Sequence, residues 1–294
     1  MNADRPLRAS LRVNNDVGVD EFVEIARVAE SLGFDQIWVS NDLFFRSAPV
    51  MLAAAATATS TIELGTCVLN PYSMHPAEIA MTAATLQELS HGRFLLGLAA
   101  GASDFLGWAG IDRPSPLRRT REAIIAIREL LDGRSPADVA GSGSGWDSAA
   151  HLRMAPSPTP IYLGAMSSHM LELIGEIADG GLPLLYPPEA LGETMQRVRA
   201  GARRSGRDEA DIDVAACIWV SVDDDEGLAR RPLAEKLVYF GASFGADVLD
   251  RVGVDAASLA ELRDLDLDVA IEQLPPEMLT LSARSATAKM TIVR

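Results

Sequence analysis

Two consecutive polar residues, Asn41 and Asp42, follow an apolar segment that has the composition of a β-strand. Ser47 stands where it would cap the next helix, so the spacing predicts that neither residue is needed for capping. The Asp42 carboxylate could then accept or deliver a proton, and the Asn41 amide could donate a hydrogen bond to a carbonyl-like oxygen. The alternative is an Asx turn, in which both residues only lead the chain away from the strand.

Small and polar residues also follow the later predicted strands. These segments run from Asn70 to His75, from Ala99 to Asp104, from Gly164 to Ser167 and from Tyr186 to Pro188. The glycines around Gly97 and Gly101 do not match the dinucleotide-binding fingerprint, but small residues still let backbone N–H groups approach a phosphate or a flat ring. His75, directly before Pro76, is either a site residue or a helix-capping histidine.

Charge and hydropathy exclude several classes of partner. The chain of 294 residues has a formal net charge of −15 and no polybasic run, which argues against nucleic acid and anionic lipid as partners. No apolar run reaches the roughly 18 residues of a membrane span. The N-terminal residues contain no apolar signal region, so we expect a cytoplasmic protein that does not bind membranes.

The reactive side chains exclude several mechanisms. The four histidines show no metal-ligand spacing with carboxylates or cysteines, and no nucleophile elbow is present, so no metal is expected. Lys236 and Lys289 are the chain's two lysines, which leaves covalent lysine catalysis almost without candidates. Cys67 and Cys217 lie in apolar stretches and are expected to be buried, unpaired thiols.

The elements that must position these residues alternate along the whole chain. The predicted strands are Ala9–Val13, Gln36–Ser40, Ile62–Leu69, Phe94–Leu98, Ile161–Leu163, Leu182–Leu185 and Val214–Val222. The predicted helices are Val19–Leu32, Ala48–Thr59, Ala77–Leu89, Pro116–Leu131, Ser168–Ala178, Glu189–Ser205 and Asp224–Phe240. This alternation predicts an α/β fold, a (β/α)₈ TIM barrel that forms one domain over residues 1–294. In such a barrel the carboxyl ends of the strands share one face, where the polar segments above would meet.

Two regions depart from the regular repeat. Residues 134–159, after the fourth predicted helix, are rich in Gly, Ser, Ala and Pro and read as an insertion, which is either inert or a lid carrying Trp146 and His151. The tail looks helical at 256–262, 269–272 and 276–281. Lys289–Arg294 is then the remaining candidate for an eighth strand, so the last unit is expected to be incomplete or rebuilt.

The chain resembles the luciferase-like flavin and deazaflavin oxidoreductases, in particular the branch that uses coenzyme F420. The matching segments, spread over about residues 8 to 282, are 33–40, 62–72, 75–77, 85–94, 96–98, 116–117, 121–123, 160–165 and 175–180. The resemblance implies a barrel, often dimeric, that holds the cofactor ring at the carboxyl ends of the strands. It also implies a non-prolyl cis peptide bond in the third strand, which here would join Cys67 to Val68.

Residue by residue, the resemblance implies a cofactor site and a reaction. The residues that would line the cofactor are Asn41, Cys67, Val68, Asn70, Ala100, Gly101, Gly164 and Ala165. The reaction is hydride transfer between coenzyme F420 and a small organic substrate, with Asp42 as proton donor or acceptor and Asn41 as an orienting donor. Many members have an aspartate at the position of Asn41 and a histidine at that of Asp42, so the identity of the substrate stays open.

Two alternatives remain open at this point. One is an FMN-dependent monooxygenase of the same family, in which the reduced flavin reacts with oxygen. The other is a catalytically silent binding subunit, which the altered Asn41–Asp42 pair and the short tail motivate. A homodimer is expected from the resemblance.

Overall fold

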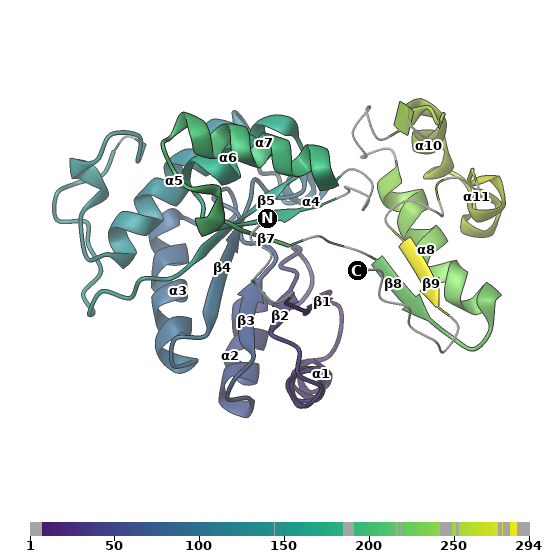
Figure 1. The fold of residues 1–294 in the computed structure, drawn as a ribbon, viewed down its shortest axis with the longest axis horizontal. Helices are drawn as coiled ribbons and strands as arrows, with labels where there is room; N and C mark the ends of the chain where they lie inside the picture. Colours follow the sequence, from purple (N-terminus) through teal and green to yellow (C-terminus); the bar gives the residue numbers. More distant parts are fainter. Residues whose placement is uncertain are drawn as a thin grey trace. The chain divides into compact units, whose positions relative to one another are not determined.

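The computed structural model describes residues 8–143, 145–184, 191–215, 217, 219–241, 249–250, 253–275, 278 and 283–286. Its main feature is a seven-stranded sheet in which the strands follow one another in chain order (Figure 1). Parallel pairing runs from β1 to β5 and again from β6 to β7. The strands are β1 (Ser10–Val13), β2 (Gln36–Val39), β3 (Glu63–Thr66), β4 (Phe94–Leu98), β5 (Ile161–Ala165), β6 (Gly180–Pro183) and β7 (Asp213–Val214).

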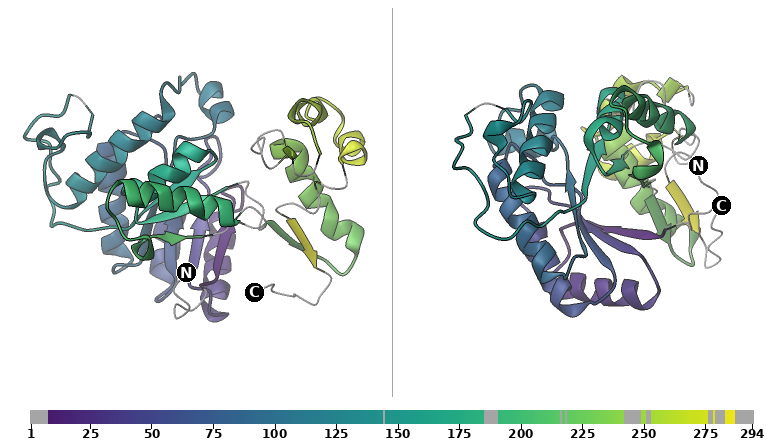
Figure 2. Two further views of the ribbon diagram at one scale, coloured as in Figure 1. Left: turned by 45° about the horizontal axis from the view of Figure 1, so that its top comes forward. Right: turned by 60° about the vertical axis from the view of Figure 1, so that its left-hand side comes forward.

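Helices cover one face of this sheet. Figures 1 and 2 show α1, α2, α3 and α5 side by side in chain order, and consecutive members of this row are in contact. The helices up to β7 are α1 (Val19–Ser31), α2 (Ala48–Ala58), α3 (Pro76–Leu89), α4 (Ser103–Trp108), α5 (Pro116–Leu131), α6 (Ser168–Ile177) and α7 (Leu191–Arg204), with short 3₁₀ turns η1 (Pro136–Asp138) and η3 (Glu209–Asp211). The predicted alternation of strand and helix is confirmed over this part of the chain, and with it the α/β class.

The chain folds as two compact units. The first comprises Met1–Ala165, Glu172–Leu182 and Val198–Val214, and the second comprises Met166–Leu171, Pro183–Arg197 and Ala215–Arg294. The first unit contains the sheet edge at which the predicted site residues lie.

The second unit contains a parallel strand pair and a small apolar core. Strand β8 (Trp219–Val222) pairs in parallel with β9 (Ala283–Ala286), beside helix α8 (Glu226–Phe240) (Figure 2). Helices α10 (Ala256–Leu262) and α11 (Leu267–Gln273) follow, and their leucines and alanines share a buried cluster with Trp219 and Leu237. The sequence pattern did not predict β9, and the segments 276–281 and 289–294 lie wholly or largely outside the described residues.

Three sequence predictions need correction. The predicted continuous strand Val214–Val222 is wrong, because β7 ends at Val214 and β8 begins at Trp219. The third strand is shorter than predicted: β3 ends at Thr66, and Leu69 keeps only an isolated bridge to Leu98. Cys67 and Cys217 are half-buried rather than buried. For Cys67 the reason is its place at the carboxyl end of a strand, where the chain leaves the sheet.

Large side chains fill the sheet interior beneath the site. The rings of Trp38 and Tyr162 pack edge to face at 5.1 Å between centroids, and Leu95 joins the same buried cluster. The Tyr162 hydroxyl donates to Asp213 Oδ2 at 2.7 Å, which satisfies its polar end. Gly65 makes room for the indole, since a Cβ there would lie 2.1 Å from Trp38 Cε3. This packing supports the strand ends from below.

The carboxylate of Glu30, on α1, organises the connection between α2 and β3. Its Oε1 accepts hydrogen bonds from the backbone N–H groups of Ser60, Thr61 and Ile62 at 2.8, 2.6 and 3.0 Å, and from the Thr61 hydroxyl at 3.0 Å. Burial of the Glu30 carboxyl raises its pKa, but these hydrogen bonds outweigh burial and lower the pKa to about 2.

We expect the Glu30→Gln substitution to flatten the acid dependence of stability. Because the folded-state pKa is below that of the unfolded chain, the stabilisation is present above about pH 5 and is lost as the pH falls through about 2. After solvent screening it amounts to about 1–2 kcal/mol. Urea unfolding at pH 7 and pH 3 measures it. The exposed Glu24→Gln on the same helix is the control, and an unchanged pH dependence in Glu30→Gln would contradict the expectation.

Candidate functional site at the carboxyl ends of the strands

Cys67 and Val68 lie between the ends of β2 and β4. The Cys67 N–H donates to Val39 O at 2.7 Å, and the Leu69 N–H donates to Gly97 O at 2.9 Å. The peptide bond between Cys67 and Val68 is cis, as the family resemblance implies. Both side chains are half-buried. The chain after β3 is therefore held to both neighbouring strands at the face where the polar loops begin.

Val68 and Gly164, both expected to line the cofactor, come together in the structure. A Cβ built on Gly164 would lie 3.2 Å from Val68 Cγ1 and 3.1 Å from Ala99 Cβ. Ala165 and Ala100 stand next to these positions with 1% and 7% exposure. The surface at the ends of β3, β4 and β5 is thus made of small or short side chains, which a flat ring can approach closely.

Asn70 and Gly101 form a second contact. Gly101 has φ of +74°, and a Cβ there would lie 3.0 Å from Asn70 Cγ. Asn70 is 5% exposed, and its Oδ1 accepts hydrogen bonds from the N–H groups of Tyr72 and Ser73 at 3.1 and 2.9 Å. The Asn70 amide therefore has a structural role in the β3–α3 loop, and a glycine at position 101 is required by both conformation and space.

Asn41 has a role that the sequence pattern excluded. The Ala48 N–H donates to Asn41 Oδ1 at 3.0 Å, whereas the Ser47 side chain makes no capping hydrogen bond. The prediction that Asn41 is not needed for capping is therefore wrong. Since its oxygen is used by α2, the remaining polar function of Asn41 is its Nδ2 group, which donates to no other described residue.

A buried asparagine holds the Asp42 loop in place. Asn15, 1% exposed, donates from Nδ2 to Asp42 O at 3.0 Å and to Arg46 O at 2.7 Å. The Asp42 side chain is half-buried at the end of β2. Sequence reasoning missed Asn15. A pair of polar residues directly after the first predicted strand, Asn14 and Asn15, was the available signal.

Four aromatic side chains gather beside this loop. The ring of Phe44 lies 6.4 Å from that of Trp108, Phe45 lies 6.3 Å from Phe105, and Phe105 lies 5.1 Å from Trp108. Phe44, Phe45 and Trp108 are 67%, 54% and 65% exposed. Phe44 also has φ of +71°, which is unusual for a bulky residue. The loop after β2 and helix α4, which the sequence analysis did not predict, thus present an apolar surface together.

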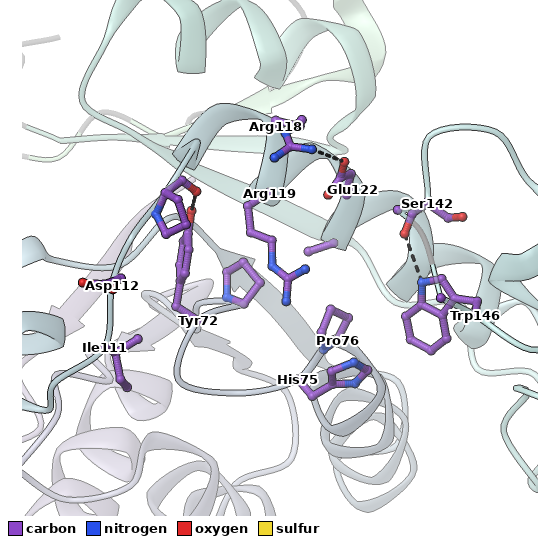
Figure 3. Close-up of a pocket in the computed structure, with 15 residues that line it drawn as sticks. Tyr72, His75, Pro76, Ile111, Asp112, Arg118, Arg119, Glu122, Ser142 and Trp146 are labelled. Atoms are coloured by element: carbon purple, nitrogen blue, oxygen red, sulfur yellow. Dashed lines mark hydrogen bonds and ion pairs between the residues drawn. The ribbon is translucent and has the colours of Figure 1, made fainter.

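A cavity of about 540 Å³ opens at the β3–α3 loop (Figure 3). Its walls come from this loop, from the α4–α5 loop, from the first turns of α5 and from the segment after η1. The lining residues are Pro71, Tyr72, His75, Pro76, Ile111, Asp112, Pro114, Arg118, Arg119, Glu122, Ala123, Ser142, Gly143, Gly145 and Trp146. None of the predicted catalytic or cofactor residues lines it.

Two residues singled out in the sequence lie on this cavity. The Ala77 N–H donates to His75 Nδ1 at 3.2 Å, so His75 is a helix cap, one of the two roles that the sequence left open. Trp146 brings the predicted insertion into the cavity wall and lies 5.3 Å from the His75 ring. His151 does not line the cavity and contacts Arg153. The predicted segment Tyr186 to Pro188 lies outside the described residues.

Within the described ranges, neither a metal site nor a membrane-spanning helix is present. No group of three or more His, Cys, Asp or Glu side chains in that part of the chain could hold a metal ion. No helix there is long and apolar enough to cross a membrane.

Comparison with known proteins shows the family to which the chain is similar. Residues 6–279 match the family described as luciferase-like monooxygenase. The chain is 34% identical over 240 residues to 5,10-methylenetetrahydromethanopterin reductase of Methanolobus tindarius, covering 81% of this chain and 72% of that protein. It is 29% identical over 287 residues to the F420-dependent glucose-6-phosphate dehydrogenase of Nakamurella multipartita, covering 91% and 81%.

A solved structure has the same fold. The coenzyme F420-dependent tetrahydromethanopterin reductase of Methanopyrus kandleri superposes with a TM-score of 0.85 over 96% of this chain and 87% of that one, at 24% identity. At this identity the likeness shows the α/β fold and nothing further.

Proposed function

The chain belongs to the luciferase-like monooxygenase family, and from this premise we infer that it is a coenzyme F420-dependent oxidoreductase. Relatives named for methylenetetrahydromethanopterin reduction and for F420-dependent glucose-6-phosphate oxidation support this activity. The reaction is hydride transfer between the deazaflavin and a small organic substrate. Coenzyme F420 supplies the hydride chemistry when bound.

The observation that carries this function is the small-residue surface at the ends of β3, β4 and β5. Gly164 faces Val68 and Ala99, and Gly101 faces Asn70. A Cβ atom on either glycine would lie within 3.2 Å of these neighbours and fill the space between them. Larger side chains there would occupy the space that a planar ring system needs. The residues present therefore fit the cofactor, and those that would hold it are Asn41, Cys67, Val68, Asn70, Ala100, Gly101, Gly164 and Ala165.

Two neighbouring side chains would serve the reaction. Asp42 stands at the end of β2 as the proton donor or acceptor. Asn41 would orient the substrate or the cofactor through Nδ2, because its Oδ1 is already used by Ala48. The protein's further contribution is to hold the reacting groups face to face and to exclude water.

The full (β/α)₈ barrel over residues 1–294 is part of the same proposal. Seven strands pair in chain order, and β9 adds a parallel partner to β8 near the end of the chain. Residues 134–159 would be the insertion, and the last unit would be incomplete or rebuilt. The homodimer and the cytoplasmic location expected from the sequence stay predictions.

Fluorescence-quench titration with coenzyme F420 and, in parallel, with FMN tests the function. We expect the dissociation constant for F420 to be at least about tenfold below that for FMN, a difference of about 1.4 kcal/mol. Gly164→Val should weaken F420 binding strongly, because its side chain would enter the ring surface beside Val68. Gly107→Ala in α4, where a Cβ meets nothing within 4 Å, is the matched control.

The other outcomes identify the alternatives. Preference for FMN would contradict the F420 assignment and favour the monooxygenase. Binding of neither cofactor would favour a catalytically silent binding subunit.

A further inference from the structure

The cavity at the β3–α3 loop, called here the Arg119 cavity, is walled by aromatic and cationic side chains. Its volume of about 540 Å³ is in the range of small-molecule sites. Tyr72 and Trp146 provide aromatic walls, and Arg118 and Arg119 extend from the first two turns of α5 (Figure 3). The cavity thus combines apolar faces with a cationic side, as sites for organic anions do.

Most polar groups of the walls already have partners. The Tyr72 hydroxyl donates to Pro114 O at 2.7 Å, and Trp146 Nε1 donates to Ser142 O at 3.0 Å. Arg118 pairs with Glu122 at 3.7 Å. These groups hold the cavity open and do not need a ligand.

Arg119 is the exception. Its guanidinium makes no hydrogen bond or ion pair with any described residue. Figure 3 shows it directed into the cavity, between Tyr72 and the side of His75 and Pro76. Asp112, a carboxylate of the same wall, lies on the far side of Tyr72 in that view. An anion in this cavity would therefore bind most favourably beside the Arg119 guanidinium, where it can form charge-assisted hydrogen bonds.

His75 adds a second donor on the same side. Its Nδ1 accepts the Ala77 N–H, so in the neutral ring the proton is on Nε2, which can donate. The His75 ring lies 5.3 Å from the Trp146 ring at 54°. A donor and an aromatic face thus stand across the cavity from Tyr72.

The cavity adjoins the proposed cofactor surface. The Tyr72 N–H donates to Asn70 Oδ1 at 3.1 Å, and Arg113 donates from the α4–α5 loop to Gly101 O at 2.7 Å. Two walls of the cavity are therefore hydrogen-bonded to residues that would line the cofactor.

We propose that the Arg119 cavity binds an organic carboxylate with a planar, unsaturated body, Arg119 pairing with the carboxylate and Tyr72 and Trp146 covering the body. This inference rests on the proposed function, since the cavity adjoins the proposed cofactor surface and the bound acid is taken as a ligand of that enzyme distinct from the cofactor. A single negative charge suits the site because, among the described wall residues, Arg119 is the one cation without a carboxylate partner, and Asp112 and Glu122 would repel a dianion.

Benzoate and its neutral analogue benzamide test the carboxylate preference at constant ionic strength. Binding is followed by calorimetry and by tryptophan fluorescence, since Trp146 lies in the wall. We expect benzoate to bind at least about tenfold more tightly than benzamide. Arg119→Gln should lower benzoate affinity about tenfold and leave benzamide affinity within twofold. Arg27→Gln, on the exposed face of α1, is the control for loss of one surface charge.

Equal affinities for the two probes, or unchanged benzoate binding in Arg119→Gln, would overturn the proposal. Titration of the same variants with coenzyme F420 tests the proposed function separately from the carboxylate site. The dissociation constant of Arg119→Gln for F420 should stay within twofold of that of the unmodified chain. A tenfold loss of F420 affinity in Arg119→Gln would overturn the assignment of the cavity to a ligand other than the cofactor. If benzoate binds in a way that depends on Arg119 but F420 does not bind, the anion site is supported and the proposed F420-dependent function is contradicted.

Discussion

Replacing Gly97 with alanine is expected to destabilise the protein by more than about 4 kcal/mol, a large part of the roughly 5–15 kcal/mol that stabilises a typical domain. A Cβ at this position would lie 1.8 Å from the Thr66 carbonyl oxygen and 3.4 Å from Leu182 Cδ1. Thr66 is fully buried, and its hydroxyl donates to Gly97 O and accepts from Gly97 N–H, both at 3.0 Å. Strands β3 and β4 would have to separate for the methyl group to fit, because the clash is with backbone and not with a movable side chain.

Urea unfolding followed by circular dichroism measures this effect. Gly107→Ala is the matched control, since it adds the same methyl group in α4 with nothing within 4 Å. We expect the control to fold with unchanged or slightly higher stability. A Gly97→Ala variant within about 1 kcal/mol of the unmodified chain would contradict the packing described here.

Replacing Asp42 with asparagine should lower kcat about a hundredfold or more while F420 affinity stays within about twofold. Asparagine has nearly the same shape as aspartate but cannot deliver or accept the proton. The reaction to follow is reduction of menadione by reduced F420, since the quinone takes up one hydride and one proton to become a quinol. Wild-type turnover in Asp42→Asn would show that Asp42 is not the proton donor.

A control variant separates loss of chemistry from loss of structure. Asp20→Asn changes an exposed carboxylate in the first turn of α1 and should leave kcat within twofold. Thermal unfolding of Asp42→Asn shows whether the fold is retained. The hydrogen bond from Asn15 to the backbone carbonyl of residue 42 does not require the carboxylate.

The fold was predictable because its signals are local. Apolar residues three or four positions apart fix the helices, and α5 was predicted with its observed bounds of Pro116 and Leu131. Strand β6 was displaced in the prediction because it begins with Gly180 and Gly181, which are poor strand formers. Both glycines are required by their neighbours, since a Cβ would meet the Tyr162 ring at 2.2 Å and Ile174 Cδ1 at 2.8 Å. Such contacts between distant segments leave no trace in a single sequence.

The site was predictable only in part, for the same reason. The contacts of Val68 with Gly164 and of Asn70 with Gly101 join strand ends, which the alternation of elements brings together. The Arg119 cavity instead depends on four separate loops and helix turns, so no motif indicates it. The capping of α2 was misjudged because Asn41 and Ser47 are both good capping residues, and which of them reaches Ala48 is decided by the path of the loop.

The capping bond of Asn41 limits how this position can evolve. A residue here must offer a short side-chain acceptor to the Ala48 N–H, so only Asp, Ser and Thr could replace Asn without cost to α2. Exchange between Asn and Asp keeps the cap and changes the charge beside Asp42 by one unit. Drift at this one position therefore changes the proton chemistry at the end of β2 while the stability of the fold stays unchanged, so substrate specificity can diverge here faster than the architecture does.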